Sequence, residues 1–285
     1  MSIHDLPGIA QILQRHGLGA HKKFGQHYLF DLNLTEKIVR LSGVTANDLV
    51  IEIGPGPGGL TRPLLSTGAK VLVIETDPKF TPLLEELQTV TGQQLELFLE
   101  DALKVNLDEL TDGKPYKVVA NLPYNVGTAL LINWLTAPKP GWQSLTLMFQ
   151  LEVAERITAK AGSSHYGRLS ILTAATASAE LVMHIPARAF TPPPKVASAV
   201  VHLEPLPPEQ RFADLEVLAR LTAMAFGQKR KMLRASLKPL GAELGQDISD
   251  WLSAQKIDPT ARPETLSPTQ FMMLATKLHE NTKRP

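Results

Sequence analysis

Short apolar runs alternate with longer amphipathic stretches through the first two thirds of the chain. The runs occupy residues 49–53, 70–75, 95–99, 118–120 and 145–150. Short runs rich in β-branched residues predict buried strands, and the stretches between them predict helices. This alternation is typical of an α/β fold in which a parallel sheet has helices on both faces.

The last third of the chain has a different pattern. Two strands of alternating polarity, 180–185 and 197–203, predict an antiparallel hairpin at the sheet edge. A proline-rich linker at 205–208 follows, and beyond it the apolar spacing is wholly helical. We therefore predict two domains, an α/β domain over residues 1–205 and a small all-α domain over residues 206–285.

A glycine-rich loop follows the first strand directly. Gly54, Gly56 and Gly59 fit the pattern G-x-G-x-x-G between a strand and a predicted helix, which predicts a Rossmann-like nucleotide site. Glycines let the backbone turn tightly and approach a ligand closely. Glu75 ends the next strand, where a carboxylate binds the ribose hydroxyls of a dinucleotide or of adenosylmethionine.

Asp101 stands just after the third strand, 95–99, where an acid is well placed to bind an adenine amino group. The alternative interpretation is that Asp101 caps a helix and that Glu75 is a surface acid. Asp77, which precedes Pro78, is a further candidate for a helix cap. Taken one at a time, these interpretations are of similar weight.

The fourth strand, 118–120, stops at a polar and aromatic corner. Pro123 cannot donate to a sheet ladder, so the strand ends before it and displays Asn121 and Tyr124 at its carboxyl end. The Asn121 amide oxygen and the Leu122 carbonyl can accept hydrogen bonds from an exocyclic amine, while the Tyr124 ring stacks on a flat base. The alternative is an ordinary strand end with an Asx turn.

Further candidates for nucleic-acid contact lie outside these strand ends. Three prolines after Phe190 make a stiff spacer that we expect to hold this ring as a second stacking wall opposite Tyr124. Some basic residues stand beside aromatic residues in loops, and others are clustered along a predicted helix. Both arrangements favour contact with phosphate groups. The ordinary alternative is a charged face that is only solvated. These cations are Lys22, Lys23, Arg168, Lys229, Arg230, Lys231 and Arg234.

The amino-acid composition excludes several kinds of site and reaction. The 285 residues contain no cysteine, which excludes disulfides, thiolate metal sites and a cysteine nucleophile. We therefore disfavour methyl transfer to pyrimidine C5, which commonly needs a cysteine nucleophile. The net charge of +1 is no global signature of nucleic-acid binding, so any basic surface is local. No apolar run has the length of a membrane span, and we expect a cytoplasmic protein without a membrane partner.

Seven segments together resemble the ribosomal RNA small-subunit adenine dimethyltransferase family, which confers kasugamycin sensitivity in bacteria. They follow the family's order and cover nearly the whole chain from residue 21. The glycine motif is shared by many methyltransferases, whereas the NLPY and FTPPPKV segments are far more specific. The segments are FGQHYL (24–29), EIGPG (52–56), ETD (75–77), NLPY (121–124), YGRLS (166–170), FTPPPKV (190–196) and FGQKRK (226–231).

The resemblance implies a Rossmann-like class I methyltransferase domain, with the helical domain as a docking surface for RNA. It implies S-adenosyl-L-methionine as methyl donor, bound by His27, Leu29, Gly54, Glu75, Asp101 and Asn121. The implied substrate is two adjacent adenosines near the 3′ end of small-subunit (16S) ribosomal RNA, each dimethylated at N6 within an immature particle. We expect a monomer. The family often has Asn and Phe where this chain has His27 and Tyr28, so the hydrogen bond made at position 27 is open.

The chemistry needs no metal and no covalent intermediate, because the sulfonium methyl is already electrophilic. Hydrogen bonds from the target N6 to Asn121 and to the Leu122 carbonyl would aim the nitrogen lone pair at the methyl carbon. The target base must be splayed out of its helix and stacked on Tyr124. The N6 proton becomes acidic after transfer and can leave to solvent, so we assign no strong general base.

Four alternatives stay open from the sequence. A nicotinamide dehydrogenase would explain the glycines and Glu75, but not Asp101 together with Asn121 and Tyr124. A DNA adenine methyltransferase would share the pocket. A related antibiotic-resistance enzyme would act on large-subunit RNA. A non-catalytic role in ribosome assembly is possible as a second activity.

Overall fold

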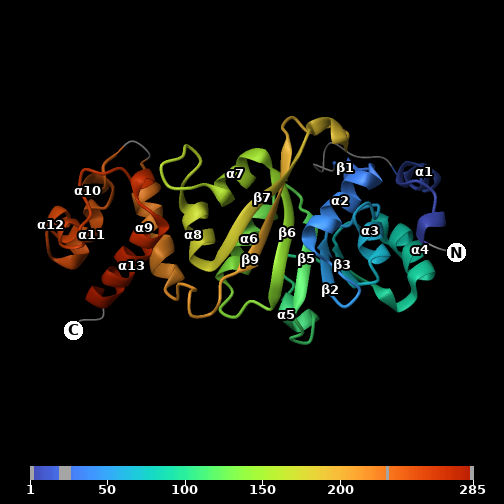
Figure 1. The fold of residues 1–285 in the computed structure, drawn as a ribbon, viewed down its shortest axis with the longest axis horizontal. Coiled ribbons are helices and arrows are strands. Elements are labelled where there is room, and N and C mark those ends of the chain that lie inside the picture. Colours follow the sequence, from blue (N-terminus) through green and yellow to red (C-terminus); the bar gives the residue numbers. More distant parts are fainter. Residues whose placement is uncertain (1–2, 19–26, 229–230, 283–285) are drawn as a thin grey trace. The chain divides into compact units, whose positions relative to one another are not determined.

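The computed structural model describes residues 3–18, 27–228 and 231–282. The chain divides into two compact units, each described here by itself (Figure 1). Unit 1 comprises residues 1–154 and 180–205, and unit 2 comprises residues 155–179 and 206–285.

Unit 1 contains a seven-stranded sheet in the order β4-β3-β2-β5-β6-β9-β7. The pairs from β4 to β6 are parallel, and β9 is antiparallel to β6. This confirms the predicted α/β class and the position of the two late strands at one edge of the sheet. β7 is the outermost strand, and β9 lies between it and β6. The strands are β2 (Leu49–Ile53), β3 (Lys70–Glu75), β4 (Leu95–Leu99), β5 (Tyr116–Asn121), β6 (Trp142–Gln150), β7 (Ala177–Ile185) and β9 (Ser198–Pro205).

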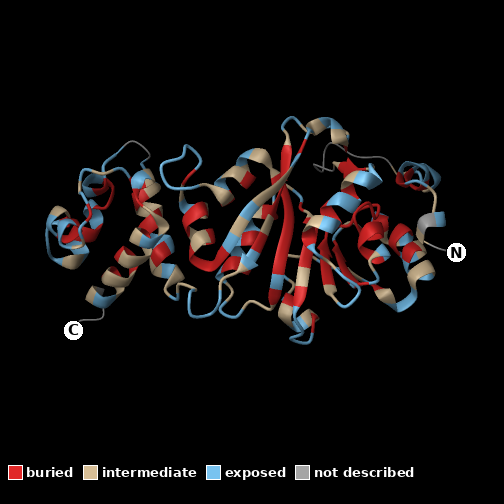
Figure 2. Ribbon diagram, viewed as in Figure 1, coloured by how far each residue is buried: buried red, intermediate tan, exposed pale blue. Residues whose placement is uncertain are grey.

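The sheet is buried on both faces, as its apolar runs predict (Figure 2). Val50, Val71 and Val119 form one cluster with apolar residues of α2, α3 and α4, and those helices cover one face. Ile51 and Val118, at alternate positions, are equally buried. The helices that begin in unit 1 are α1 (Ile9–Arg15), α2 (Leu32–Ser42), α3 (Thr61–Ser66), α4 (Thr81–Thr91), α5 (Leu107–Leu110), α6 (Gly127–Thr136) and α7 (Leu151–Thr158).

A second sheet of two short strands joins segments that are distant in sequence. β1 (Tyr28–Leu29) pairs antiparallel with β8 (Phe190–Thr191), so Tyr28 faces Thr191 and Leu29 faces Phe190. The sequence did not predict this pair, because two residues are too few for an alternation pattern. Its consequence is that the segment before Phe30 is held against the proline-rich connection.

The described part of unit 2 is mainly helical, apart from residues 177–179 at the start of β7. Its core includes Leu221, Leu233, Trp251 and Phe271, which are nearly inaccessible to solvent. Its helices are α8 (Arg168–Thr176), α9 (Leu215–Phe226), α10 (Leu233–Ser236), α11 (Lys238–Leu244), α12 (Ile248–Ala254) and α13 (Pro268–Thr282).

The division into units differs from the predicted boundary in one segment. Residues 155–179, which we predicted in the α/β domain, group with the helical unit. The reason is packing, because α8 lies against α9 and α13, and its Ile171 and Ala175 belong to the unit 2 core. The other boundary falls between Pro205 and Leu206, at the predicted linker.

Candidate active site

The carboxyl ends of β2, β3, β4 and β5 surround one cavity of about 510 Å³ in unit 1. Because these strands are parallel, the residues that follow them meet at a single sheet edge. The structure thus brings together nearly all the predicted donor and base-binding residues. Those lining the cavity are His27, Leu29, Gly54, Gly56, Glu75, Asp101, Asn121, Leu122 and Tyr124.

The glycine loop needs glycine for both conformation and space. Gly54 and Gly56 have φ values of +67° and +53°, in the left-handed region that side chains rarely adopt. A Cβ atom on Gly59 would lie 2.7 Å from the Leu29 carbonyl oxygen. The loop therefore packs directly against β1, and its backbone forms one wall of the cavity.

Glu75 is held by backbone N–H groups at the base of the cavity. Gly56 N donates to its Oε2 at 3.1 Å, and Thr76 N and Asp77 N donate to its Oε1 at 2.8 and 2.9 Å. Burial nevertheless raises the pKa of Glu75, and the backbone hydrogen bonds oppose that rise. The carboxylate is fixed against the glycine loop, and its remaining lone pairs can accept from ribose hydroxyls.

Asp101 closes a turn and does not cap a helix, and it also lines the cavity. Its Oδ1 accepts a hydrogen bond from Leu103 N at 3.0 Å, which closes a turn after β4. Within the described part of the chain, Oδ2 makes no hydrogen bond, and the residue lines the cavity. Asp77 is the predicted cap, accepting from Lys79 N at 3.1 Å at the start of η3 (Pro78–Phe80).

Asn121 ends β5, and its side chain bridges to β1 instead of forming an Asx turn. Its Nδ2 donates to the His27 carbonyl oxygen at 3.4 Å, a long hydrogen bond. This contact orients the amide so that Oδ1 is the acceptor left for a ligand. The Tyr124 hydroxyl is hydrogen-bonded to Ser198 Oγ at 2.8 Å, which holds the ring at the cavity.

Phe190 does not take the predicted place as an open stacking wall. Its side chain is only 2% exposed, and it is not among the residues lining the cavity. The His27 ring lies between it and the site, 6.5 Å from the Phe190 ring and 5.8 Å from the Tyr124 ring, centroid to centroid. His27 is therefore the aromatic side chain that faces Tyr124, because the β1–β8 pairing turns Phe190 into the core.

The sequence analysis overlooked Glu52. This side chain lines the cavity from β2 and is 2% exposed, and its Oε2 has no hydrogen-bond partner within residues 3–18, 27–228 and 231–282. Burial raises the pKa of Glu52 to about 8, and the charge of Glu75 adds to the rise. The neighbouring Thr61 hydroxyl acts in the opposite direction and lowers this pKa, but not enough to offset burial. The sequence did contain a signal for this residue, because Glu52 is an acid within an otherwise apolar predicted strand.

The charge of the cavity discriminates between ligands. Among the described residues that line it, carboxyl groups outnumber the one ammonium, that of Lys79. Such a cavity favours a cation and disfavours the pyrophosphate of a nicotinamide dinucleotide. The carboxylates belong to Glu75, Asp77, Glu100 and Asp101, whereas Glu52, with its pKa raised to about 8, is mostly protonated at neutral pH.

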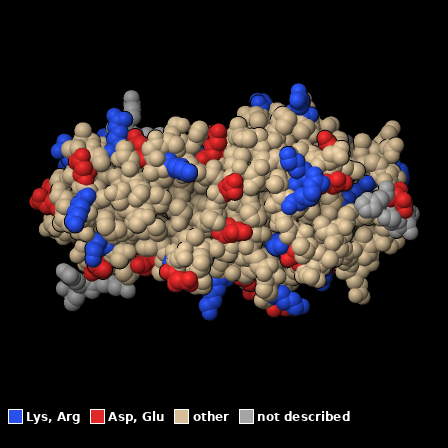
Figure 3. Space-filling model, in the orientation of Figure 1, with Lys and Arg blue, Asp and Glu red and all other residues tan. Residues whose placement is uncertain are grey.

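The predicted RNA-contact cations are only partly described. Lys22, Lys23, Lys229 and Arg230 lie outside the described residues. Arg168, Lys231 and Arg234 are exposed, and all three belong to unit 2. Acidic and basic side chains are interspersed on the face of each unit that Figure 3 shows.

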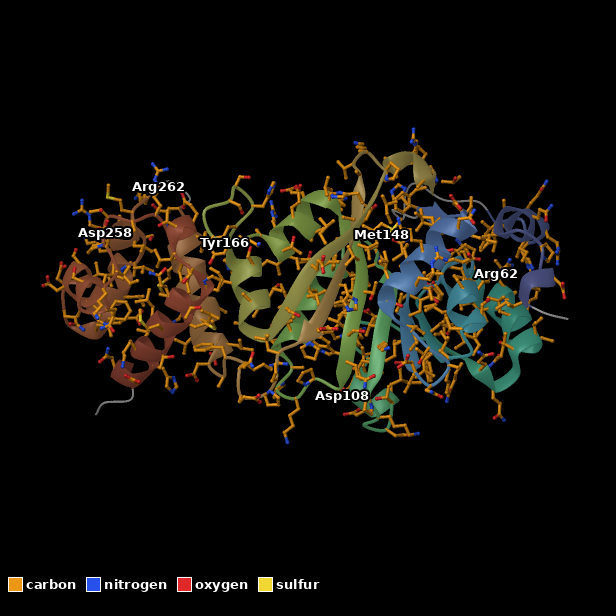
Figure 4. The ribbon with its side chains drawn as sticks, in the orientation of Figure 1. Arg62, Asp108, Met148, Tyr166, Asp258 and Arg262 are labelled. Carbon is orange, nitrogen blue, oxygen red and sulfur yellow. The ribbon has the colours of Figure 1, made fainter. Side chains whose placement is uncertain are left out.

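The predicted helix through residues 229–234 is wrong in its described part. Helix α10 begins at Leu233, so Lys231 and Arg234 do not share a helix face. Leu233 N and Arg234 N instead donate to the carbonyls of Ala261 and Pro259. This pairing sets α10 beside the loop that carries Asp258 and Arg262 (Figure 4).

The described residues form neither a metal site nor a membrane-spanning helix. No group of three or more His, Cys, Asp or Glu side chains has the arrangement of a metal site there. None of the described helices has the length and apolar character needed to cross a membrane.

Comparison with known proteins finds relatives over almost the full length. A family model described as "Ribosomal RNA adenine dimethylase" matches residues 17–280. The chain is 53% identical to "Ribosomal RNA small subunit methyltransferase A" of Phenylobacterium zucineum strain HLK1, over 96% of this chain and 94% of the relative. It is 50% identical to the protein of the same name in Ruegeria sp. strain TM1040, over 98% and 99%.

Two solved structures with similar folds are a dimethyladenosine transferase and a 23S rRNA methyltransferase. A dimethyladenosine transferase from Plasmodium falciparum has a TM-score of 0.74 at 26% identity, covering 90% of this chain and 98% of that one. The 23S rRNA methyltransferase ErmE has a TM-score of 0.66 at 25% identity, covering 88% and 99%.

The buried Glu52 predicts an unusual dependence of stability on pH. Between its unfolded pKa near 4.5 and its folded pKa of about 8, the folded state holds a proton that the unfolded chain has released. Stability contributed by this group is therefore lost as pH rises through that window, by up to about 1.4 kcal/mol per pH unit. We expect Glu52→Gln to gain stability relative to wild type over the same window.

Urea unfolding of both proteins between about pH 5 and about pH 9 measures this difference. Glu85→Gln, at an exposed position on α4, is the matched control and should parallel wild type. A difference between Glu52→Gln and wild type that stays constant with pH would show that Glu52 is ionised throughout.

Proposed function

The chain belongs to the ribosomal RNA adenine dimethylase family, and from this premise we propose how its site works. It is an S-adenosyl-L-methionine-dependent ribosomal RNA adenine dimethyltransferase. We propose that it methylates N6 of two adjacent adenosines near the 3′ end of small-subunit (16S) ribosomal RNA, giving N6,N6-dimethyladenosine. The observation that carries this proposal is the convergence of an acid-lined nucleotide cavity with the oriented Asn121 amide.

The donor fits the residues present. Glu75 would accept from the ribose hydroxyls, and Asp101 Oδ2 would accept from the adenine amino group. The glycine loop at Gly54 and Gly56 lets the donor approach the backbone closely. The cationic donor also suits the acidic lining. When bound, S-adenosyl-L-methionine supplies an electrophilic methyl group on sulfur.

The acceptor base would occupy the side of the cavity nearest Asn121 and Tyr124. Asn121 Oδ1 and the Leu122 carbonyl accept hydrogen bonds from the target N6 and direct its lone pair toward the methyl carbon. Tyr124 stacks on the splayed-out base. Alignment of this kind accounts for up to about 7–11 kcal/mol of a barrier.

Sequence identity to known proteins distinguishes between small-subunit and large-subunit ribosomal RNA as the substrate we propose. Identity is 53% to a small-subunit methyltransferase and 25% to a 23S rRNA methyltransferase. We therefore favour small-subunit over large-subunit RNA. A nicotinamide dehydrogenase is disfavoured by the acidic cavity.

We propose that the enzyme acts as a monomer on an immature small subunit, in the cytoplasm, where such particles assemble. Unit 2 is the proposed docking surface. Its exposed Arg168, Lys231 and Arg234 are cations suited to phosphate contact. Arg262, 60% exposed beside α10, is a further cation of the same region.

A methyl-transfer assay with labelled S-adenosyl-L-methionine tests the function. The substrates are small-subunit particles that lack the modification, naked small-subunit RNA, large-subunit RNA and duplex DNA, each digested to nucleosides. We expect dimethyladenosine from the small-subunit particle. Label in DNA or large-subunit RNA would contradict the proposed substrate. Absence of label in every substrate, with the donor bound, would favour a non-catalytic role in ribosome assembly.

Stacking on Tyr124 predicts a specific pair of variants. Tyr124→Ala should lower kcat/KM by about 5- to 150-fold, corresponding to about 1–3 kcal/mol of stacking. Tyr124→Phe keeps the ring, loses only the hydrogen bond to Ser198, and should retain most activity. Steady-state kinetics on the small-subunit particle measure both, and equal losses in the two variants would contradict stacking.

Docking through unit 2 predicts a change in salt dependence. Lys231→Gln and Arg234→Gln should each weaken particle binding and reduce the slope of log K against log salt by about 1. Arg220→Gln is the control, because Arg220 is paired with Glu243 at 2.9 Å. Binding titrations at several salt concentrations measure the slopes, and an unchanged slope in both variants would remove these residues from the interface.

A further inference from the structure

The imidazole of His27 is fixed in one tautomer by the two-stranded sheet. Its Nδ1 lies 2.7 Å from the Pro192 carbonyl oxygen, next to the pairing of Tyr28 with Thr191. A carbonyl oxygen only accepts, so Nδ1 carries the hydrogen and donates it. In the neutral ring Nε2 is then a hydrogen-bond acceptor with a free lone pair.

The ring is placed where the target base would bind. His27 lines the cavity, and its ring centroid is 5.8 Å from that of Tyr124. Its own carbonyl oxygen accepts from Asn121 Nδ2, so His27 is also adjacent to the amide that orients the target amine. Nε2 has no hydrogen-bond partner among the residues that the structure describes.

The reaction releases a proton at this place. When the N6 lone pair forms its bond to the methyl carbon, the carbon–sulfur bond breaks and the positive charge moves from sulfur to N6. N6 must then lose a proton to become a neutral amine. The Asn121 and Leu122 oxygens can accept hydrogen bonds from N6 but are too weakly basic to hold the proton, whereas a neutral imidazole can.

Three other titratable groups of the cavity are less suited than His27. Both Glu75 oxygens already accept backbone hydrogens beside the glycine loop. Asp101 follows β4, at the end of the cavity assigned to the donor adenine. Tyr124 is hydrogen-bonded to Ser198, and burial raises the pKa of its hydroxyl. The phenol therefore keeps its own proton, and a neutral phenol is a poor acceptor of a second one.

We propose that His27 Nε2 receives the proton that the target N6 loses at each methyl transfer, an inference that rests on the proposed function. The imidazolium that forms keeps its Nδ1–H bond to the Pro192 carbonyl and returns the proton to solvent. The effect is greatest at the second transfer. There the departing proton is the last one on a nitrogen that carries two methyl groups, and those groups shield it from water.

Single-turnover methylation of the small-subunit particle tests this role, with monomethyl- and dimethyladenosine measured separately. The variants are His27→Gln, His27→Phe and His27→Ala, with His184→Ala, exposed on β7, as control. We expect His27→Gln and His27→Phe to slow the second transfer by about 10²-fold, so that monomethyladenosine accumulates. Binding of S-adenosylhomocysteine, measured for each variant, separates a loss of the donor site or of the fold from a loss of proton transfer.

Chemical rescue separates proton transfer from packing. Added imidazole should restore the second transfer in His27→Ala, and more basic imidazoles should restore it further. A His27→Gln enzyme that completes the second transfer at the wild-type rate would overturn the proposal, because an amide cannot take the proton. Absence of dimethyladenosine from the wild-type enzyme would instead overturn the proposed function itself.

Discussion

The parallel direction of four strands is the constraint on which the site depends. Because β2, β3, β4 and β5 run the same way, the residues after each strand reach the same edge of the sheet. The glycine loop, Glu75, Asp101 and Asn121 are far apart in sequence, yet they surround one cavity. The burial of the strands on both faces supplies the stability that holds this edge rigid.

The short β1–β8 pair completes the half of the cavity nearest the target base. It holds His27 against the Pro192 carbonyl and brings the His27 backbone within reach of Asn121. Two residues on each strand are enough, because Tyr28, Leu29 and Phe190 are buried and anchor the pair in the core. The side of the cavity proposed to bind the target base is therefore built from three segments, and hydrogen bonds within the protein orient its polar atoms.

Electrostatics gives this cavity its selectivity. Carboxyl groups dominate its lining, and two of them, Glu52 and Glu75, have pKa values that burial raises. A buried acid without a hydrogen-bond partner is costly to the folded protein. Glu52 lies beside the proposed site for a cationic donor. Proteins often place groups that destabilise the fold at their ligand sites, and Glu52 fits that tendency.

The sequence by itself determined the strands, the glycine loop and the acids and amide that follow the strands. Each of these depends on local pattern, because β-branched runs form buried strands and polar residues gather where strands end. Tertiary structure alone decided the grouping of residues 155–179 with the helical unit, the burial of Phe190 and the position of His27 opposite Tyr124. These three depend on contacts between segments distant in sequence, and such contacts leave no periodic signal in either segment.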